Sequence, residues 1–171
     1  MRARATGGAR TTALFAFVAV VCVAALAIAL TSQHVYDMQP CPWCVLQRLI
    51  FCAITLFALL GLVWRGAAGG RVAGTFALLL AFAGIAAALW QQLYAVNEFS
   101  CDLSLAERII SGLHLDRVAP NIFIAYASCG DAAVNVLGVP FAIWSCVMFV
   151  LLALLVAWTV RTATRTAGAR A

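Results

Sequence analysis

The stretch Cys41-Pro42-Trp43-Cys44-Val45-Leu46-Gln47-Arg48 opens an apolar run that continues from Leu49 to Trp64. Two cysteines at C-x-x-C spacing therefore stand at the start of a segment long enough to cross a membrane, and an arginine follows one helical turn later. Placing an arginine at the centre of a bilayer costs about 2.5–3.5 kcal/mol on insertion scales, and less near the interface. A combination this costly predicts a functional dithiol at the rim of a membrane.

The composition of the whole chain indicates a membrane protein. Of the 171 residues, 65% are hydrophobic and only 10% are charged, whereas soluble domains carry about 25% charged residues. The formal net charge of +5 rests on arginines that are scattered along the chain rather than clustered, so it does not indicate a nucleic-acid partner.

Four apolar runs predict an all-α fold, a four-transmembrane-helix bundle in a single integral membrane domain (1–171). The predicted spans are about 13–30, 44–64, 72–90 and 141–160. The first run has eighteen residues without a charge, which nearly cross a ~30 Å hydrocarbon core. The alternative is a signal peptide cleaved after Ala27-Ile28-Ala29, but the apolar region of a signal peptide has only about 7–15 residues. The glycine-rich 65–71 segment is a tight turn that makes the second and third spans an antiparallel hairpin.

The distribution of the arginines predicts the orientation of the spans. The head, the 65–71 turn and the tail hold eight arginines and no acidic residue, while all six acidic residues lie in the other connections. The positive-inside rule therefore places both termini in the cytoplasm, and it places the loops at about 31–43 and 91–140 outside it.

Four of the seven cysteines fall in or beside these outer loops: Cys41, Cys44, Cys101 and Cys129. Disulfides persist outside the cytoplasm and rarely inside it, so this side of the membrane permits thiol–disulfide chemistry. The remaining cysteines fall within spans and are interpreted as small apolar residues in helix packing. They are Cys22, Cys52 and Cys146.

The first cysteine pair has the features of a redox-active dithiol. Pro42 suits the first position of a helix, which puts Cys41 near the N-cap and Cys44 in the first turn, where free N–H groups favour a thiolate. Arg48 lies four residues after Cys44 and therefore on the same helix face. We expect it to stabilise the Cys44 thiolate and to donate hydrogen bonds to an electron acceptor in the lipid; the alternative is an arginine that reaches back to the headgroups. Gln47 can contact the same acceptor or face another helix.

Cys101 and Cys129 have 27 residues between them, and this spacing leaves more than one interpretation open. A disulfide that closes a loop of this size stabilises a fold by roughly 3–4 kcal/mol, which would be a purely structural role. A disulfide within reach of a reactive pair can instead exchange with it and pass on two electrons. A zinc site made by the four outer cysteines is a further alternative, but no second C-x-x-C supports it, and we expect no metal site.

The second outer loop is predicted to contain a short amphipathic helix. Ser104-Leu105-Ala106-Glu107 has the S-x-x-E form of a capping box, and apolar residues recur at helical spacing up to Leu113. We expect this helix to lie on the outer face of the membrane, with packing against the span ends as the alternative. Ala119-Pro120 should end it, and residues 121–130 should form an irregular loop that carries Cys129.

These features together resemble the DsbB family of bacterial inner-membrane disulfide-forming proteins. The likeness covers essentially the whole chain, with four spans, a short first and a long second outer loop, and a cysteine pair in each. Its most specific part is the pattern P-C-x-x-C-x-x-x-R, which is met by Pro40, Cys41, Cys44 and Arg48.

The resemblance implies a path for electrons. A periplasmic thioredoxin-fold oxidase of the DsbA type would reduce Cys101–Cys129, Cys129 would attack Cys41, and the released Cys44 thiolate would reduce a membrane quinone (ubiquinone or menaquinone) beside Arg48. The net reaction would support periplasmic disulfide bond formation. Some family members have a histidine soon after the third span, where this chain reads Tyr94-Ala95-Val96-Asn97-Glu98, so quinone contacts at that position are not implied.

Two other classes of protein fit part of the pattern. The vitamin K epoxide reductase family is also a four-helix thiol–quinone system, but its C-x-x-C stands late in the chain rather than at Cys41. A non-enzymatic membrane subunit with two structural disulfides would account for the cysteines and would leave Arg48 without a role.

Overall fold

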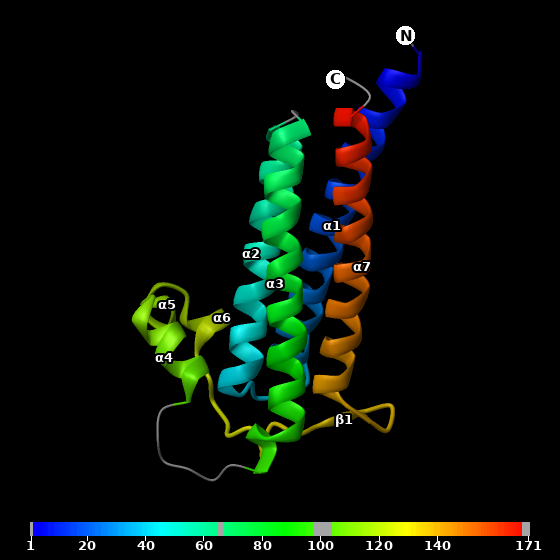
Figure 1. Ribbon diagram of the computed structural model, residues 1–171. Helices are drawn as coiled ribbons and strands as arrows, with labels where there is room; N and C mark the ends of the chain where they lie inside the picture. Colours follow the sequence, from blue (N-terminus) through cyan, green and yellow to red (C-terminus); the bar gives the residue numbers. More distant parts are fainter. Residues whose placement is uncertain (1, 65–66, 98–103, 169–171) are drawn as a thin grey trace.

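The computed structural model of the protein describes residues 2–64, 67–97 and 104–168, without the side chains of residues 2–8, 67, 163 and 165–168. Four long helices run side by side (Figure 1): α1 (Arg2–Val35), α2 (Pro42–Val63), α3 (Ala67–Leu93) and α7 (Phe141–Gly168). Each contains a segment that is long and apolar enough to cross a membrane. The predicted all-α fold, a four-transmembrane-helix bundle with a short helix in its second outer loop, is therefore confirmed.

Contacts among the four helices close the bundle. α3 and α1 each pack against both α2 and α7, which produces a ring in the order α1, α2, α3, α7. The close approach of α3 and α7 depends on Gly84, because a Cβ atom added there would lie 2.4 Å from the ring of Phe149. That ring stacks on Phe51 of α2 with the centroids 4.3 Å apart. The helices α2, α3 and α7 therefore meet where a glycine lies against two stacked aromatic rings.

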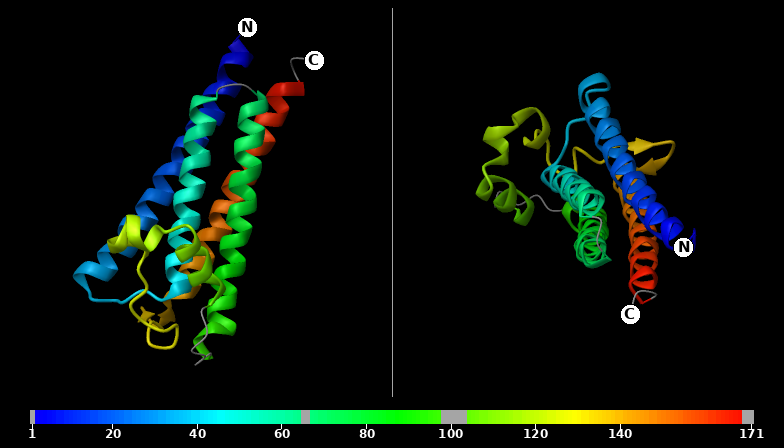
Figure 2. Two further views of the ribbon diagram at one scale, coloured as in Figure 1. Left: turned by 90° about the vertical axis from the view of Figure 1, so that its left-hand side faces the viewer. Right: turned by 90° about the horizontal axis from the view of Figure 1, so that it is seen from above.

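The two ends of the bundle differ in what they carry. The start of α1, the end of α2, the start of α3 and the end of α7 lie at one end, and the short elements between α3 and α7 gather at the other (Figure 2). Among the described residues, the first end holds Arg2, Arg4, Arg10, Arg71, Arg161 and Arg165, and the second holds the acidic residues Asp37, Glu107, Asp116 and Asp131. Because the chain crosses the bundle four times, the first and the last long helix have their free ends on the same side.

The helices extend beyond the apolar runs that predicted them. α1 begins at Arg2 and ends at Val35, and α7 continues from Phe141 to Gly168. Hydropathy marks only the part of a helix that suits the hydrocarbon core, whereas residues with good helix propensity prolong a helix once it has been nucleated. The apolar runs therefore located the helices and underestimated their length.

The segment between α3 and α7 contains more helix than the sequence predicts. In its described part the helical elements are η1 (Ala95–Asn97), α4 (Leu105–Gly112), α5 (Leu115–Val118) and α6 (Pro120–Phe123). The capping box of α4 is confirmed: Ser104 Oγ accepts from the Glu107 N–H at 3.3 Å, and the Glu107 carboxylate accepts from the Ser104 N–H at 3.0 Å. The expectation of an irregular loop from residue 121 was wrong for its first three residues, because Pro120 starts a further helical turn.

The amphipathic helix α4 uses only part of its apolar surface for packing. Ile110 is buried in a small cluster with Phe123 of α6 and Val45 of α2, which holds the outer segment against the bundle. Leu105 and Leu113 are exposed, so this edge of the helix can meet the membrane surface.

A β-hairpin, β1 (Asn135–Val136) and β2 (Val139–Pro140), precedes α7 and was not predicted. Leu137 and Gly138 form its two-residue turn with φ of 54° and 79°, and a type I′ turn requires positive φ at both positions. Leucine rarely adopts this conformation, so the sequence carries no strong turn signal. Trp144 Nε1 donates to the Val136 carbonyl at 3.2 Å and ties the hairpin to the first turn of α7.

Candidate functional site

The start of α2 places two thiols next to each other at the end of the bundle that also holds the short elements between α3 and α7. Cys41 is the N-cap, with φ −87° and ψ 167°, and Pro42 occupies the first turn, as the sequence predicts. The sulfur of Cys41 accepts from the Cys44 N–H at 3.3 Å, and the two sulfurs lie 2.8 Å apart. Disulfide formation between them needs only a small further approach, because an S–S bond is about 2.05 Å long.

Cys129 reaches the same position from the other outer segment. The chain after α6 is attached to the start of α2, because the Pro40 carbonyl accepts from the N–H groups of Tyr126 at 3.0 Å and of Ala127 at 3.4 Å. This attachment brings the thiols of Cys129 and Cys41 into hydrogen-bonding contact, and both are buried. The structure thus joins three of the four predicted site cysteines into one cluster.

The hydrogen bond between Cys41 and Cys129 makes the two thiols chemically unequal. As the donor, Cys41 has its pKa raised by its contact with Cys129, with further increases from Cys44 and from burial. The pKa of Cys129 is lowered chiefly because Cys41 donates to its sulfur, although burial acts against this effect. Cys129 is therefore the more easily ionised partner, and Cys41 is the sulfur that it faces.

Arg48 is buried and tied to three separate segments. Its Nη1 donates to Gln33 Oε1 of α1 at 2.6 Å and to the carbonyl of Ile122 in α6 at 3.0 Å, and its Nη2 donates to the carbonyl of Ala29 at 3.4 Å. Only 5% of the residue is exposed, so its side chain is enclosed by the protein. These partners are all neutral oxygens, and the guanidinium remains a positive charge in apolar surroundings.

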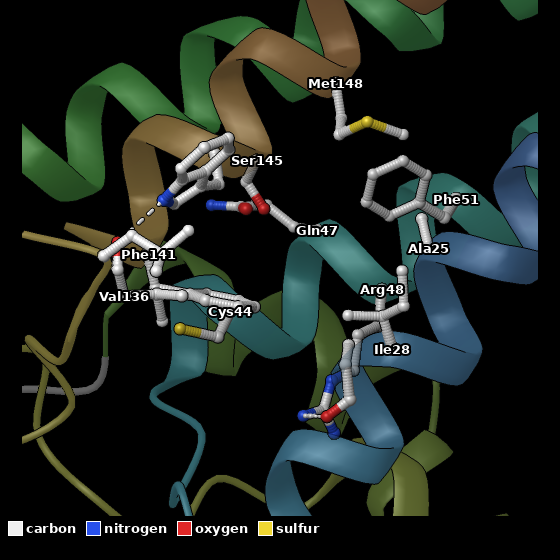
Figure 3. Close-up of a pocket in the computed structure, with 13 residues that line it drawn as sticks. Ala25, Ile28, Cys44, Gln47, Arg48, Phe51, Val136, Phe141, Ser145 and Met148 are labelled. Carbon is white, nitrogen blue, oxygen red and sulfur yellow. Dashed lines mark hydrogen bonds between the residues drawn. The ribbon is translucent and has the colours of Figure 1, made fainter. Parts of the chain in front are cut away.

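Cys44, Gln47 and Arg48 share one wall of an apolar cavity of about 330 Å³ (Figure 3). Residues of α1, α2, α7 and the β-hairpin supply the other walls: Ala25, Ile28, Ala29, Phe51, Val136, Leu137, Phe141, Trp144, Ser145 and Met148. Small-molecule sites commonly have this size and this combination of apolar walls with a few convergent polar groups. The cavity therefore suits a small apolar ligand that carries hydrogen-bond acceptors.

A second hollow of about 420 Å³ adjoins the thiol cluster. Cys129 lines it, together with Trp43 and with polar and acidic groups that include Ser104, Glu107 and Asp131. Its polar lining suits a protein segment in water rather than a lipid-soluble molecule. The thiol cluster thus connects a polar hollow, lined by Cys129, with the apolar cavity, lined by Cys44.

Sequence reasoning missed two buried glutamines at this site. Gln33 holds Arg48, and Gln91 near the end of α3 donates from Nε2 to the Cys44 sulfur at 3.2 Å. Gln47 donates from Nε2 to Gln91 Oε1 at 2.7 Å. The only signal in the sequence was an amide residue at the end of an apolar span, which is too common to single out a site.

Cys101 lies outside the described residues, so its position relative to Cys129 stays a prediction. Among the residues that are described, no cluster of three or more ligating side chains is arranged to hold a metal ion. Of the cysteines assigned to helix packing, Cys22 is buried, while Cys52 and Cys146 are half-buried.

A four-span bundle that carries a buried thiol cluster between a polar hollow and an apolar cavity defines a membrane protein suited to thiol–disulfide chemistry. Comparison with known proteins identifies the family. A family model described as "Disulfide bond formation protein DsbB" matches residues 10–159. The chain therefore belongs to the DsbB family, whose members are oxidoreductases of disulfide bond formation.

Individual relatives show the same likeness over most of their length. Disulfide bond formation protein B of Aromatoleum aromaticum is 37% identical over 147 residues, which are 84% of this chain and 88% of the relative. The protein of the same name from Burkholderia pseudomallei is 32% identical over 84% of this chain and 86% of its own. Disulfide bond formation protein B 1 of Pseudomonas savastanoi pv. phaseolicola is 36% identical over 80% and 82%.

Proposed function

We propose that the protein oxidises the dithiol of a periplasmic thioredoxin-fold partner of the DsbA type and reduces a membrane quinone, ubiquinone or menaquinone, to quinol. In the net reaction two thiols of the partner become one disulfide, and two electrons and two protons pass to the quinone. The partner, reoxidised in this way, supplies disulfides to proteins of the periplasm. Membership of the DsbB family supports the reaction class.

The observation that carries this proposal is the connection between the two hollows. Cys129 faces the polar hollow and touches Cys41, and Cys44, within 2.8 Å of Cys41, faces the apolar cavity beside Arg48. A water-borne dithiol and a lipid-borne oxidant can therefore act on the same cluster of sulfurs without meeting each other.

The proposed path begins at a disulfide between Cys101 and Cys129. The partner's thiolate attacks Cys101, which forms a mixed disulfide and releases Cys129 as a thiolate. Cys129 then attacks Cys41 of a Cys41–Cys44 disulfide, and Cys44 leaves as a thiolate. Cys129 leaves the first exchange as a thiolate, which is the form that attacks a disulfide.

The path closes without net change in the protein. The partner's second thiolate resolves the mixed disulfide, which releases Cys101 and leaves the partner oxidised. Cys101 then attacks Cys129 and frees Cys41. The resulting Cys41 and Cys44 thiols re-form their disulfide when they give two electrons and two protons to the quinone.

Arg48 and Gln47 are the residues that we propose to hold the quinone. A quinone accepts hydrogen bonds at its two carbonyl oxygens and accumulates negative charge there as it is reduced. A guanidinium in an apolar wall stabilises that charge more than it would in water, because little solvent screens it. The apolar residues from α1 and α7 would contact the ring faces.

We infer that the protein lies in the bacterial inner membrane as one integral domain, with both termini in the cytoplasm. The end of the bundle where α1 begins and α7 ends carries Arg10, Arg71 and Arg161, in agreement with the positive-inside rule. The thiol cluster and both hollows then belong to the periplasmic side, where disulfides persist.

The test uses the full chain purified in detergent, a reduced DsbA-type partner and a soluble ubiquinone whose absorbance is followed. The wild-type protein should reduce quinone, and Cys44→Ser should abolish the reaction. Cys146→Ser is the matched control, because that residue lies in α7 outside the thiol cluster, and it should retain activity. Quinone reduction that persists in Cys44→Ser would reject the proposed role of the dithiol.

A further inference from the structure

Gln91 is a buried amide in contact with the sulfur that faces the apolar cavity. It lies near the end of α3 with 5% of its surface exposed, and its Nε2 donates to Cys44 Sγ at 3.2 Å. The path proposed above assigns no role to it. A buried polar side chain aimed at a reactive sulfur calls for a chemical explanation.

Gln47 determines which end of the Gln91 amide faces the sulfur. Because Gln47 Nε2 donates to Gln91 Oε1 at 2.7 Å, the NH₂ group of Gln91 is the end left for Cys44. An NH₂ group is a donor only, so it stabilises sulfur best when the sulfur is negatively charged. The order Gln47, Gln91, Cys44 is therefore a relay of donors that ends at the thiolate.

We propose that Gln91 is a catalytic residue that donates a hydrogen bond to the Cys44 thiolate, and that Gln47 is a positioning residue that orients it. This inference rests on the proposed function. When Cys129 attacks Cys41, the Cys41–Cys44 bond breaks and its electron pair goes to Cys44. The amide of Gln91 meets that charge as it forms, so no proton has to reach Cys44 before it can leave.

The location of the sulfur makes this hydrogen bond important. The cavity that Cys44 faces is largely apolar, and a thiolate there has little water to solvate it. Among the described residues, the Gln91 amide is the side-chain N–H donor in direct hydrogen-bonding contact with Cys44. A hydrogen bond to a charged group corresponds to roughly a tenfold to hundredfold change in an equilibrium.

The experiment measures the Cys44 thiolate directly, without quinone or partner. Cys44 is kept as the only cysteine of the full chain, and its alkylation by iodoacetamide is followed from neutral to strongly alkaline pH. Gln91→Met keeps the length of the side chain and removes the donor. Gln92→Met, on the neighbouring half-buried residue of α3, is the matched control.

We expect Gln91→Met to slow alkylation at neutral pH about tenfold or more, with equal rates at strongly alkaline pH where every thiol is ionised. Gln47→Met should slow it by a smaller factor, and Gln92→Met should leave the profile unchanged. A role in helix packing alone would change the rate at both ends of the pH range or at neither. Either of those results for Gln91→Met would overturn the proposal.

The same variants separate this inference from the function on which it rests. In the quinone assay with all cysteines present, Gln91→Met should lower kcat and leave KM for the partner unchanged. If the wild-type protein reduces no quinone, the proposed function fails. If the wild-type protein is active and Gln91→Met matches it in kcat and in alkylation, only the role of Gln91 fails.

Discussion

Arg48→Gln is the substitution that probes the proposed quinone site most specifically. A guanidinium has five N–H donors, and in the described part of the chain three are engaged, by Gln33, Ile122 and Ala29. Two donors therefore remain for a ligand in the cavity. Glutamine keeps a polar side chain of shorter reach and removes both the charge and the planar fork.

The size of the effect follows from the hydrogen bonds that are lost. A hydrogen bond from a charged donor is worth about 1.5–3 kcal/mol, which corresponds to roughly a tenfold to hundredfold change. We expect Arg48→Gln to raise KM for soluble ubiquinone by about that factor. Since charge on the quinone oxygens grows during reduction, kcat should fall as well.

The assay is steady-state quinone reduction with saturating reduced partner and varied quinone. Arg161→Gln is the matched control, because Arg161 is exposed at the other end of the bundle, and it should leave both constants unchanged. If KM for quinone in Arg48→Gln stays within twofold of wild type and kcat is unaffected, the assignment of the cavity to the quinone is wrong.

Three further predictions concern the thiols and the core. Cys129→Ser should block electron transfer from the partner, while a small dithiol should still reduce Cys41–Cys44 and drive quinone reduction. Loss of both reactions would contradict the proposal that Cys129 acts only in the transfer from the partner to Cys41–Cys44. The hydrogen bond from Cys41 lowers the pKa of Cys129, so the Cys129 thiolate persists to lower pH in the wild-type protein. Cys41→Ala should therefore shift the pH profile of Cys129 alkylation to higher pH. A shift to lower pH would refute this cause. Gly84→Ala should destabilise the bundle by about 1–3 kcal/mol through the clash with Phe149 and lower the melting temperature in detergent, whereas Gly112→Ala, with open space around it, should not.

The parts of the site that follow from local sequence were predictable. The C-x-x-C pattern with Pro42 specified a helix start with Cys41 at its N-cap, and the structure has this arrangement. The spacing of four residues from Cys44 to Arg48 placed both side chains on one helix face, and both line the same cavity. These relations are set within one turn or two of a single helix.

The partners of those residues depend on how helices pack, which no local pattern specifies. Gln33 is 15 residues from Arg48 and Gln91 is 47 residues from Cys44, and neither pair belongs to a repeating spacing. The meeting of Cys129 with Cys41 depends on backbone hydrogen bonds to the Pro40 carbonyl. Such contacts become visible only once the outer segment is folded against the bundle.

The β-hairpin before α7 was missed for a different reason. Its turn contains Leu137 in a left-handed conformation that leucine seldom adopts, so turn propensity points elsewhere. The hairpin nevertheless supplies Val136 and Leu137 to the cavity wall. The composition of this loop alone does not predict that these two residues line a cavity.

In the proposed function, electrons enter at Cys101 and Cys129 and leave from Cys44 to a quinone. The most direct measurement is the stoichiometry under anaerobic conditions, with catalytic amounts of the full chain, reduced DsbA-type partner and soluble ubiquinone. We expect one quinol for each partner disulfide formed, and neither product with Cys44→Ser. Partner oxidation without an equal amount of quinol, or quinol formation by Cys44→Ser, would contradict the proposed function.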